Sequence, residues 1–143
     1  MRYIILIAGK GNRLHPLTLQ MPKSLYKLEA STTILERMIE IIRKNDSKAL
    51  FSIVIGFKAE EIQNRIGNSR DITFIYNPFY SVTNSIASLW FAKEFLEGDV
   101  TIINGDIVME DSIISDVVCK PVKTPCVLID SSIKSQGDYN VEV

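Results

Sequence analysis

The sequence predicts an α/β fold with a mainly parallel sheet, and three observations carry that prediction. Short apolar runs rich in Ile and Val alternate with longer amphipathic segments along the chain. The first apolar run, YIILIA at residues 3–8, has no polar interruption, which is typical of a strand buried on both faces. A glycine-rich loop follows this run, and parallel sheets bind ligands at such carboxyl ends of their strands.

The elements after the first strand continue the same alternation. Residues 31–45 are expected to form a helix, because Ser and Thr side chains can cap its start and basic residues suit its end. If the strands are ordered 3-2-1-4-5 across the sheet, the loops after the first and fourth strands face one crevice. Expected strands lie at residues 3–8, 50–56, 72–77, 99–105 and 125–130, and expected helical segments at residues 31–45, 58–67, 83–98 and 110–118.

The end of the chain is polar and lacks a clear closing element. After Asp130 the sequence reads SSIKSQGDYNVEV, and its last four residues look like the start of an unfinished strand. We therefore expect the 143 residues to be part of a single domain, as a fragment or a truncated copy.

Composition and charge narrow the class of partner. Charged residues make up 23% of the chain and the formal net charge is −1, so no global basic field favours nucleic acid or an anionic membrane. No apolar stretch reaches the roughly 18–20 residues that a membrane span needs. Cys119 and Cys126, with His15 far away in the sequence, do not form a metal-binding pattern and are interpreted as free thiols. We expect a cytoplasmic protein without a nucleic-acid or membrane partner.

The loop after the first strand, IAGKGNRLHPLTLQMPKSL, allows three interpretations. A dinucleotide fingerprint needs glycine at the position of Leu14 and a helix directly afterwards, which the two prolines of the loop oppose. A P-loop is excluded, because no lysine stands at its required spacing from the glycines. The third interpretation, a loop whose backbone amides wrap a nucleoside triphosphate, fits throughout. In such a loop Arg13 can fork onto phosphate oxygens and Lys23 can supply a point charge.

This loop resembles the signature of the nucleotidyltransferases that make nucleotide-activated sugars and alcohols. The resemblance rests on LIAGKGNRLHPLT with PKSL downstream, and on NGDIVMED, which resembles the family's magnesium-binding Gly-Asp segment. The segment YNPFYSVTNSIASLWFAKEFL looks most like the bacterial choline-phosphate cytidylyltransferases of that superfamily. The resemblance implies a three-layer α/β/α fold with a Rossmann-like sheet, of the nucleotide-diphospho-sugar transferase type. Family members are usually much longer, so residues 1–143 would be the nucleotide-binding, N-terminal part of one nucleotidyltransferase domain.

The resemblance implies nucleotidyl transfer with Mg²⁺ as cofactor. A phosphate monoester such as phosphocholine would attack the α-phosphate of CTP, and pyrophosphate would leave. The second pKa of a phosphate monoester is about 6, so the nucleophile is mostly ionised at neutral pH and needs no general base. The site must bring two polyanions together in line and balance their charge. The alternatives are a sugar-1-phosphate uridylyl- or thymidylyltransferase and a nucleotide-binding fragment without catalytic activity.

The residues that the resemblance implies come from three segments. In the opening loop, Arg13 would neutralise the β- and γ-phosphates, and Lys23 would bridge the α-phosphate and the incoming monoester; these two are the expected catalytic residues. Asp106 would ligate Mg²⁺ and Asn84 would contact the base. The expected nucleotide-binding residues are Ala8, Gly9, Gly11, Asn12, Arg13 and Asn84.

Some of these residues also have purely structural explanations. Asp106 is also suited to a turn, and Asn84 stands where a helix N-cap is expected.

Trp90 is expected in the core, because it lies one turn from Ile86 on an apolar face. Tyr80, in the preceding loop, is the better candidate for a cation–π contact with a quaternary ammonium group.

Overall fold

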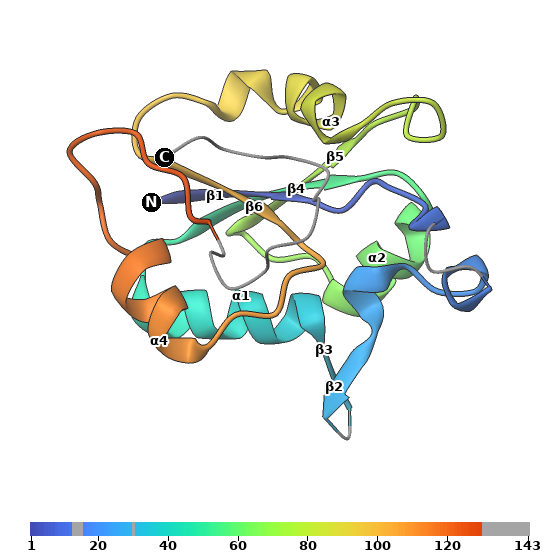
Figure 1. The fold of residues 1–143 in the computed structure, drawn as a ribbon, viewed down its shortest axis with the longest axis horizontal. Helices are drawn as coiled ribbons and strands as arrows, with labels where there is room; N and C mark the ends of the chain where they lie inside the picture. Colours follow the sequence, from blue (N-terminus) through green and yellow to red (C-terminus); the bar gives the residue numbers. More distant parts are fainter. Residues whose placement is uncertain (13–15, 30, 130–143) are drawn as a thin grey trace.

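The computed structural model of the chain describes residues 1–12, 16–29 and 31–129. Four parallel strands form its central sheet in the order β5-β4-β1-β6 (Figure 1). The prediction of a parallel sheet in which the first and fourth expected strands are neighbours is confirmed. The strands are β1 (Arg2–Leu6), β4 (Leu50–Ile55), β5 (Ile72–Tyr76) and β6 (Val100–Asn104).

The carboxyl ends of the central strands lie at the same level. Leu6 of β1 lies opposite Val54 of β4 and Asn104 of β6. The loops that follow β1 and β6 therefore leave the sheet side by side. Strands on both sides and helices on both faces cover β1, so three of its five residues have no exposed surface.

One face of the sheet is covered by α1 (Ile34–Asn45) and α2 (Ala59–Ile66) (Figure 1). Beside α1 lie the short helix α4 (Asp111–Ile113) and the π-helical turn Ile114–Val118 that continues it. α2 ends at Gly67, as predicted. The apolar side chains of these elements and of the sheet form the larger of two core clusters.

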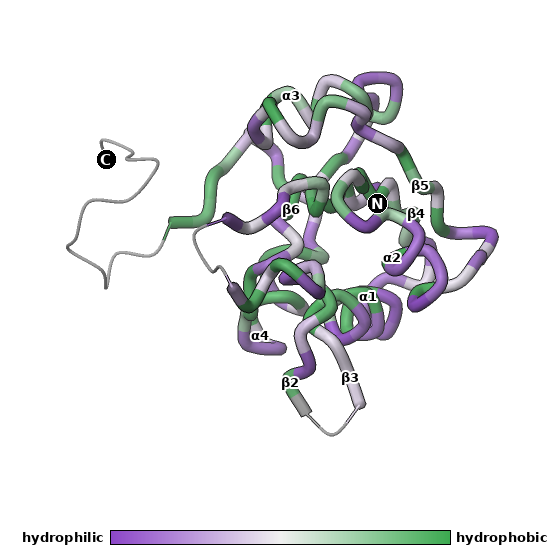
Figure 2. Tube along the Cα trace, turned by 90° about the vertical axis from the view of Figure 1, so that its right-hand side faces the viewer, coloured by the Kyte–Doolittle hydropathy of each residue, from purple (hydrophilic) through white to green (hydrophobic). Residues whose placement is uncertain are grey.

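α1 starts and packs as its sequence predicts. The Thr33 hydroxyl accepts the Glu36 N–H at 3.2 Å, and the Glu36 carboxylate accepts the Thr33 N–H at 2.8 Å, which completes a capping box. Hydrophobic residues (green) alternate with hydrophilic residues (purple) along α1 in Figure 2. The buried stripe consists of Leu35, Met38, Ile39 and Ile42.

α3 (Ser85–Phe91) covers the opposite face and completes the three layers (Figure 1). The helix predicted over residues 83–98 is shorter than expected, because the chain leaves the helix at Ala92 and continues in a 3₁₀ turn, Lys93–Phe95. Small buried side chains such as Ala92 pack this helix on the sheet. Trp90, predicted in the core, is instead 65% exposed. None of the helices among the described residues has both the length and the apolar character needed to cross a membrane.

One prediction about strands is wrong, and one short pair of strands was not predicted. The strand expected over residues 125–130 is absent from the described part, where residues 125–129 have no regular structure and Val127, Leu128 and Ile129 are at least half exposed. Its apolar run needs a neighbouring strand, and none pairs with it among the described residues. A short antiparallel pair, β2 (Lys27–Glu29) and β3 (Thr32–Thr33), was not predicted, because it is too short to produce a periodic pattern.

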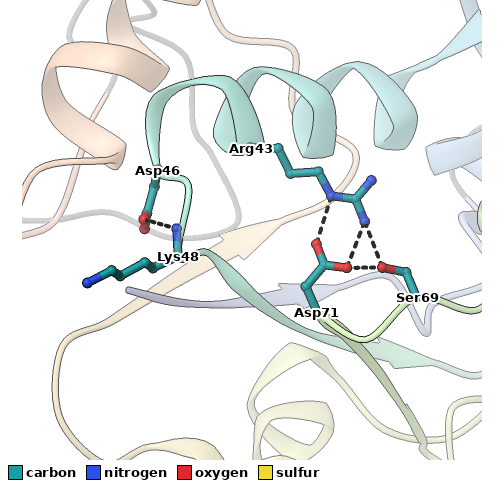
Figure 3. A network of polar contacts seen from close by, with 5 residues as sticks. All are labelled: Arg43, Asp46, Lys48, Ser69 and Asp71. Atoms are coloured by element: carbon teal, nitrogen blue, oxygen red, sulfur yellow. Dashed lines mark hydrogen bonds and ion pairs between the residues drawn. The ribbon is translucent and has the colours of Figure 1, made fainter.

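A polar network fastens the C-terminal end of α1 to the amino ends of the strands (Figure 3). Arg43 donates to both carboxylate oxygens of Asp71 at 2.8 and 3.1 Å, directly before β5. Asp46, which follows α1, accepts the Lys48 N–H at 3.0 Å and the N-terminal ammonium of Met1 at 2.8 Å. The hydrogen bonds from Arg43 are the main cause that holds the pKa of Asp71 below its usual value, although partial burial opposes them. This network therefore lies at the amino ends of the strands, whereas the glycine-rich loop follows the carboxyl end of β1.

Candidate active site

A pocket of about 320 Å³ lies at the carboxyl ends of the strands, where the loops after β1 and β6 meet. Its lining comes from the glycine-rich loop, the 3₁₀ turn Lys23–Leu25, the segment between β5 and α3, and the end of β6. The predicted site residues Gly9, Gly11, Asn12, Lys23 and Asp106 all belong to this lining. The full lining consists of Leu6, Ile7, Gly9, Lys10, Gly11, Asn12, Lys23, Ser24, Tyr80, Ser81, Thr83, Ser85, Asn104 and Asp106.

Gly11 has a structural reason to be glycine. Its φ of +66° lies in the left-handed region, which side chains disfavour. A Cβ at this position would also lie 2.7 Å from Lys23 Cε and 3.0 Å from Thr18 Cγ2. The buried Thr18 donates its hydroxyl to the Gly11 carbonyl at 2.8 Å and holds the loop in this shape. Gly9 differs, because a Cβ there would meet nothing within 4 Å, so its backbone stays open to the pocket.

Lys23 and Asp106 face each other at the pocket, although 83 residues separate them in the sequence. Lys23 Nζ lies 3.5 Å from Asp106 Oδ2, and the two side chains are 22% and 45% exposed. Gly105 sets the position of Asp106, since a Cβ on Gly105 would overlap Ile7 Cγ2 and lie 2.7 Å from Ile5 Cγ2. Only glycine lets this turn rest directly on β1. The arrangement offers a cation and a carboxylate to one ligand.

Asn77 shapes the wall of the pocket on the α3 side. It is fully buried at the end of β5, and its Nδ2 donates to the hydroxyls of Thr83 and Ser88 at 3.1 and 3.0 Å. Its Oδ1 accepts the Phe79 N–H at 2.8 Å. These hydrogen bonds connect the loop to both β5 and α3, so Tyr80 and Thr83 are held at the pocket.

Asn84 caps α3 and does not line the pocket. Its Oδ1 accepts the Ala87 N–H at 3.2 Å, the geometry of an N-cap, and its two neighbours Thr83 and Ser85 are the lining residues. The structure therefore shows the capping role that the sequence offered as an alternative, and contact with a base stays a prediction.

Ala8, predicted to bind the nucleotide, does not belong to the lining of the pocket. It is 3% exposed, and its carbonyl accepts the Phe57 N–H at 2.9 Å. Arg13 and His15 lie outside the described residues, so the phosphate contacts expected of Arg13 stay a prediction.

Six lining residues with polar or charged side chains were not predicted as site residues from the sequence: Lys10, Ser24, Ser81, Thr83, Ser85 and Asn104. Lys10 Nζ lies 5.7 Å from the ring centroid of Tyr80, whose ring lies 6.4 Å from that of Phe57. Tyr80 thus faces a cation of its own chain. The sequence positions of Lys10 and Ser24 could have indicated that they belong to the site, since Lys10 stands between the two glycines of the loop and Ser24 directly follows Lys23.

The donor set of the pocket suits a metal ion that arrives with phosphates. Within the described ranges, no three or more His, Cys, Asp or Glu side chains gather to hold a metal ion. Asp106 is the one carboxylate among the described lining residues, with Asn104 also at the pocket. Mg²⁺ keeps several waters and often takes only one or two carboxylates together with substrate phosphates. The residues present fit that mode of binding, and not a site made by protein ligands alone.

Comparisons with known proteins agree with this geometry. A family model described as nucleotidyl transferase matches residues 2–124. The chain is 36% identical to the bifunctional protein GlmU of Methanococcus maripaludis over 110 residues. This matched region covers 77% of this chain and 26% of that protein. The chain is also 34% identical to the choline-phosphate cytidylyltransferase of Haemophilus influenzae over 113 residues. This second matched region covers 79% of this chain and 47% of that protein.

The fold is also similar to a solved structure, the CTP:phosphocholine cytidylyltransferase LicC from Streptococcus pneumoniae. The TM-score is 0.64 at 28% sequence identity, over 73% of this chain and 44% of that chain. The chain thus spans about a quarter to a half of the length of the curated relatives named above. The family resemblance and the three-layer fold that it implies are confirmed.

Proposed function

Because the chain belongs to the nucleotidyl transferase family, we propose that residues 1–143 form the nucleotide-binding, N-terminal part of one nucleotidyltransferase domain. The observation that carries this proposal is the pairing of Lys23 with Asp106, 3.5 Å apart, beside the open backbone of the glycine loop. A cation can hold phosphates, a carboxylate can hold their metal ion, and glycine amides can approach the phosphates closely.

The proposed reaction transfers CMP from CTP to a phosphate monoester of the phosphocholine type. A monoester oxygen attacks the α-phosphorus, the bond from that phosphorus to the oxygen bridging to the β-phosphorus breaks, and pyrophosphate leaves with the electron pair. Lys23 would hold the α-phosphate and the incoming monoester, and Arg13 the departing β- and γ-phosphates. Backbone N–H groups from Gly9 to Asn12 would cradle the triphosphate.

Asp106 is the residue proposed to hold Mg²⁺. The ion would supply charge neutralisation at the phosphates and orient them for in-line attack. The carboxylate is 45% exposed at the pocket, so it can exchange Lys23 for a metal ion without unfolding its surroundings. Lys23, once released, would be free to bind phosphate oxygens.

CTP is the proposed nucleotide because of two similarities, to the choline-phosphate cytidylyltransferase of Haemophilus influenzae and to the solved LicC structure. The opening loop favours no particular base. Tighter binding of UTP or dTTP than of CTP would favour a sugar-1-phosphate uridylyl- or thymidylyltransferase. Binding without any pyrophosphate release, with acceptor in excess, would favour a nucleotide-binding fragment without catalytic activity.

Calorimetric titration tests the proposed function. The chain is titrated with CTP, UTP and dTTP in the presence of Mg²⁺, with cytidine as the control ligand that lacks phosphates. We expect CTP to bind most tightly and cytidine at least tenfold more weakly, since hydrogen bonds to charged phosphates are worth about 1.5–3 kcal/mol each. If no nucleoside triphosphate binds, the proposed function is wrong. Pyrophosphate release with phosphocholine then tests the acceptor.

A further inference from the structure

Ser24 carries a buried hydroxyl without a hydrogen-bond partner. The residue is 2% exposed, and its Oγ has no partner among the described residues. Buried hydroxyls in folded proteins nearly always have a partner, because an unmade hydrogen bond in the interior costs the group its hydration. The unpaired hydroxyl of Ser24 therefore needs an explanation.

The position of Ser24 provides one. Ser24 lines the same pocket as the glycine loop and Asp106. It directly follows Lys23 in the 3₁₀ turn Lys23–Leu25, so this turn brings the residues Lys23 and Ser24 to one pocket. The side chain of Ser24 is short, and its oxygen stays close to a backbone that the turn holds by hydrogen bonds from Leu25 N–H to Pro22 O and from Tyr26 N–H to Lys23 O, both at 3.0 Å.

Tyr26 shows that lack of a partner alone does not mark a ligand site. Its buried hydroxyl also lacks a partner among the described residues, yet Tyr26 does not belong to the pocket lining. Of these two residues, only Ser24 combines an unpaired buried donor with a place at the pocket.

We propose that the Ser24 hydroxyl donates a hydrogen bond to a phosphate oxygen of the bound nucleoside triphosphate. This inference rests on the proposed function, since it takes the ligand of the pocket to be a nucleoside triphosphate. A phosphate oxygen only accepts hydrogen bonds and carries negative charge, so a hydroxyl donor forms a charge-assisted bond with it. The free protein then holds a donor that the ligand satisfies, and Ser24 is a substrate-binding residue beyond those predicted from the sequence.

Ser24→Ala and Tyr26→Phe form a matched pair of variants, because each removes one buried hydroxyl without a partner. Both should melt at or above the temperature of the unchanged protein, since neither loses a hydrogen bond. Ser24→Ala should bind Mg²⁺–CTP and inorganic tripolyphosphate about 10–100-fold more weakly, the loss of one hydrogen bond to a charged group. Tyr26→Phe should bind both ligands as the unchanged protein does. Thermal unfolding and calorimetry measure these effects.

The outcomes separate this inference from the proposed function. If the unchanged protein binds no nucleoside triphosphate, the proposed function fails and Ser24 loses its ligand. If it binds CTP and Ser24→Ala binds CTP equally well, the inference about Ser24 alone is wrong. A lower melting temperature of Ser24→Ala would mean that the hydroxyl already has a partner in the free protein, which also overturns it. Weaker CTP binding with unchanged tripolyphosphate binding would move the contact to the ribose or base and refute the phosphate assignment.

Discussion

Replacing Gly11 with alanine should disturb the candidate site in two ways that can be measured separately. The backbone of Gly11 has φ +66°, where a side chain costs roughly 1–2 kcal/mol. The new Cβ would also lie 2.7 Å from Lys23 Cε and 3.0 Å from Thr18 Cγ2. Thr18 is buried, whereas Lys23 has a long, flexible stem, so Lys23 is the side chain that moves. Its ammonium group would then leave Asp106.

The expected loss of stability follows from these two terms. Strain of roughly 1–2 kcal/mol and overpacking of roughly 1–3 kcal/mol together lower the free energy of unfolding by about 2–4 kcal/mol, with partial relaxation. For a domain of this size each kcal/mol corresponds to about 4 °C, so the melting temperature should fall by about 8–16 °C. The displaced ammonium should also weaken Mg²⁺–CTP binding, by up to about tenfold.

Two other glycines provide controls for Gly11→Ala. Gly67 ends α2 with φ +74°, and a Cβ there would meet nothing within 4 Å, so Gly67→Ala measures backbone strain alone. Gly9→Ala should keep its stability but bind CTP more weakly, because its Cβ would occupy space at the pocket. Thermal unfolding and calorimetric titration with Mg²⁺–CTP give both quantities. If Gly11→Ala is no less stable than Gly67→Ala and binds CTP normally, the steric link between Gly11 and Lys23 is refuted.

Four further substitutions test charges of the site and of the scaffold. In a version of the protein that carries out the proposed reaction, Lys23→Ala should lower turnover about 10²–10³-fold, measured as pyrophosphate release, and weaken CTP binding much less, because its charge matters most where two phosphates meet; near-normal turnover would remove Lys23 from catalysis. Asp106→Asn should abolish the Mg²⁺ dependence of CTP binding in titrations with and without metal, and cost at most about 1 kcal/mol of stability, since its ion pair is partly exposed. Arg13→Lys keeps the charge but loses the planar fork, so calorimetry should find weaker CTP binding with CMP binding unchanged. The lowered pKa of Asp71 means that its contribution to stability is present above pH about 4 and is lost as pH falls through the folded-state pKa, so Asp71→Asn should flatten the acid side of a plot of melting temperature against pH.

The sheet could be predicted from the sequence because its pattern is local. Strands such as β4 are apolar runs buried on both faces, and the helices between strands carry an apolar stripe, so the two periods are easy to separate. The length of the helix after Asn84 could not be predicted in this way. Apolar residues continue in the sequence after the end of α3, but the chain leaves the helix at Ala92, whose small side chain lies in one core cluster with Ile4 and Val54. That packing also explains why Trp90 lies on the surface.

In the candidate site too, some features follow from the local sequence and others depend on the fold. The spacing of glycines and lysine in the opening loop predicted which residues would gather there, and Gly9, Gly11 and Lys23 do line one pocket. The approach of Lys23 to Asp106 depends on the order of the strands, which joins segments 83 residues apart. The importance of Ser24 depends on burial and on missing partners, which no local pattern records.

The contact of Gly105 with Ile5 and Ile7 links the interior of the protein to its chemistry. The Gly105 backbone rests so close to these two side chains that a Cβ would not fit, so their volume bears on the position of the next residue, Asp106. A larger or smaller residue at Ile5, which is fully buried, would therefore be expected to change the proposed metal affinity from inside the core. Under the proposed function, repacking Ile5 to raise thermal stability would also shift the proposed metal ligand, so the site would restrict side-chain volume at a position in the core.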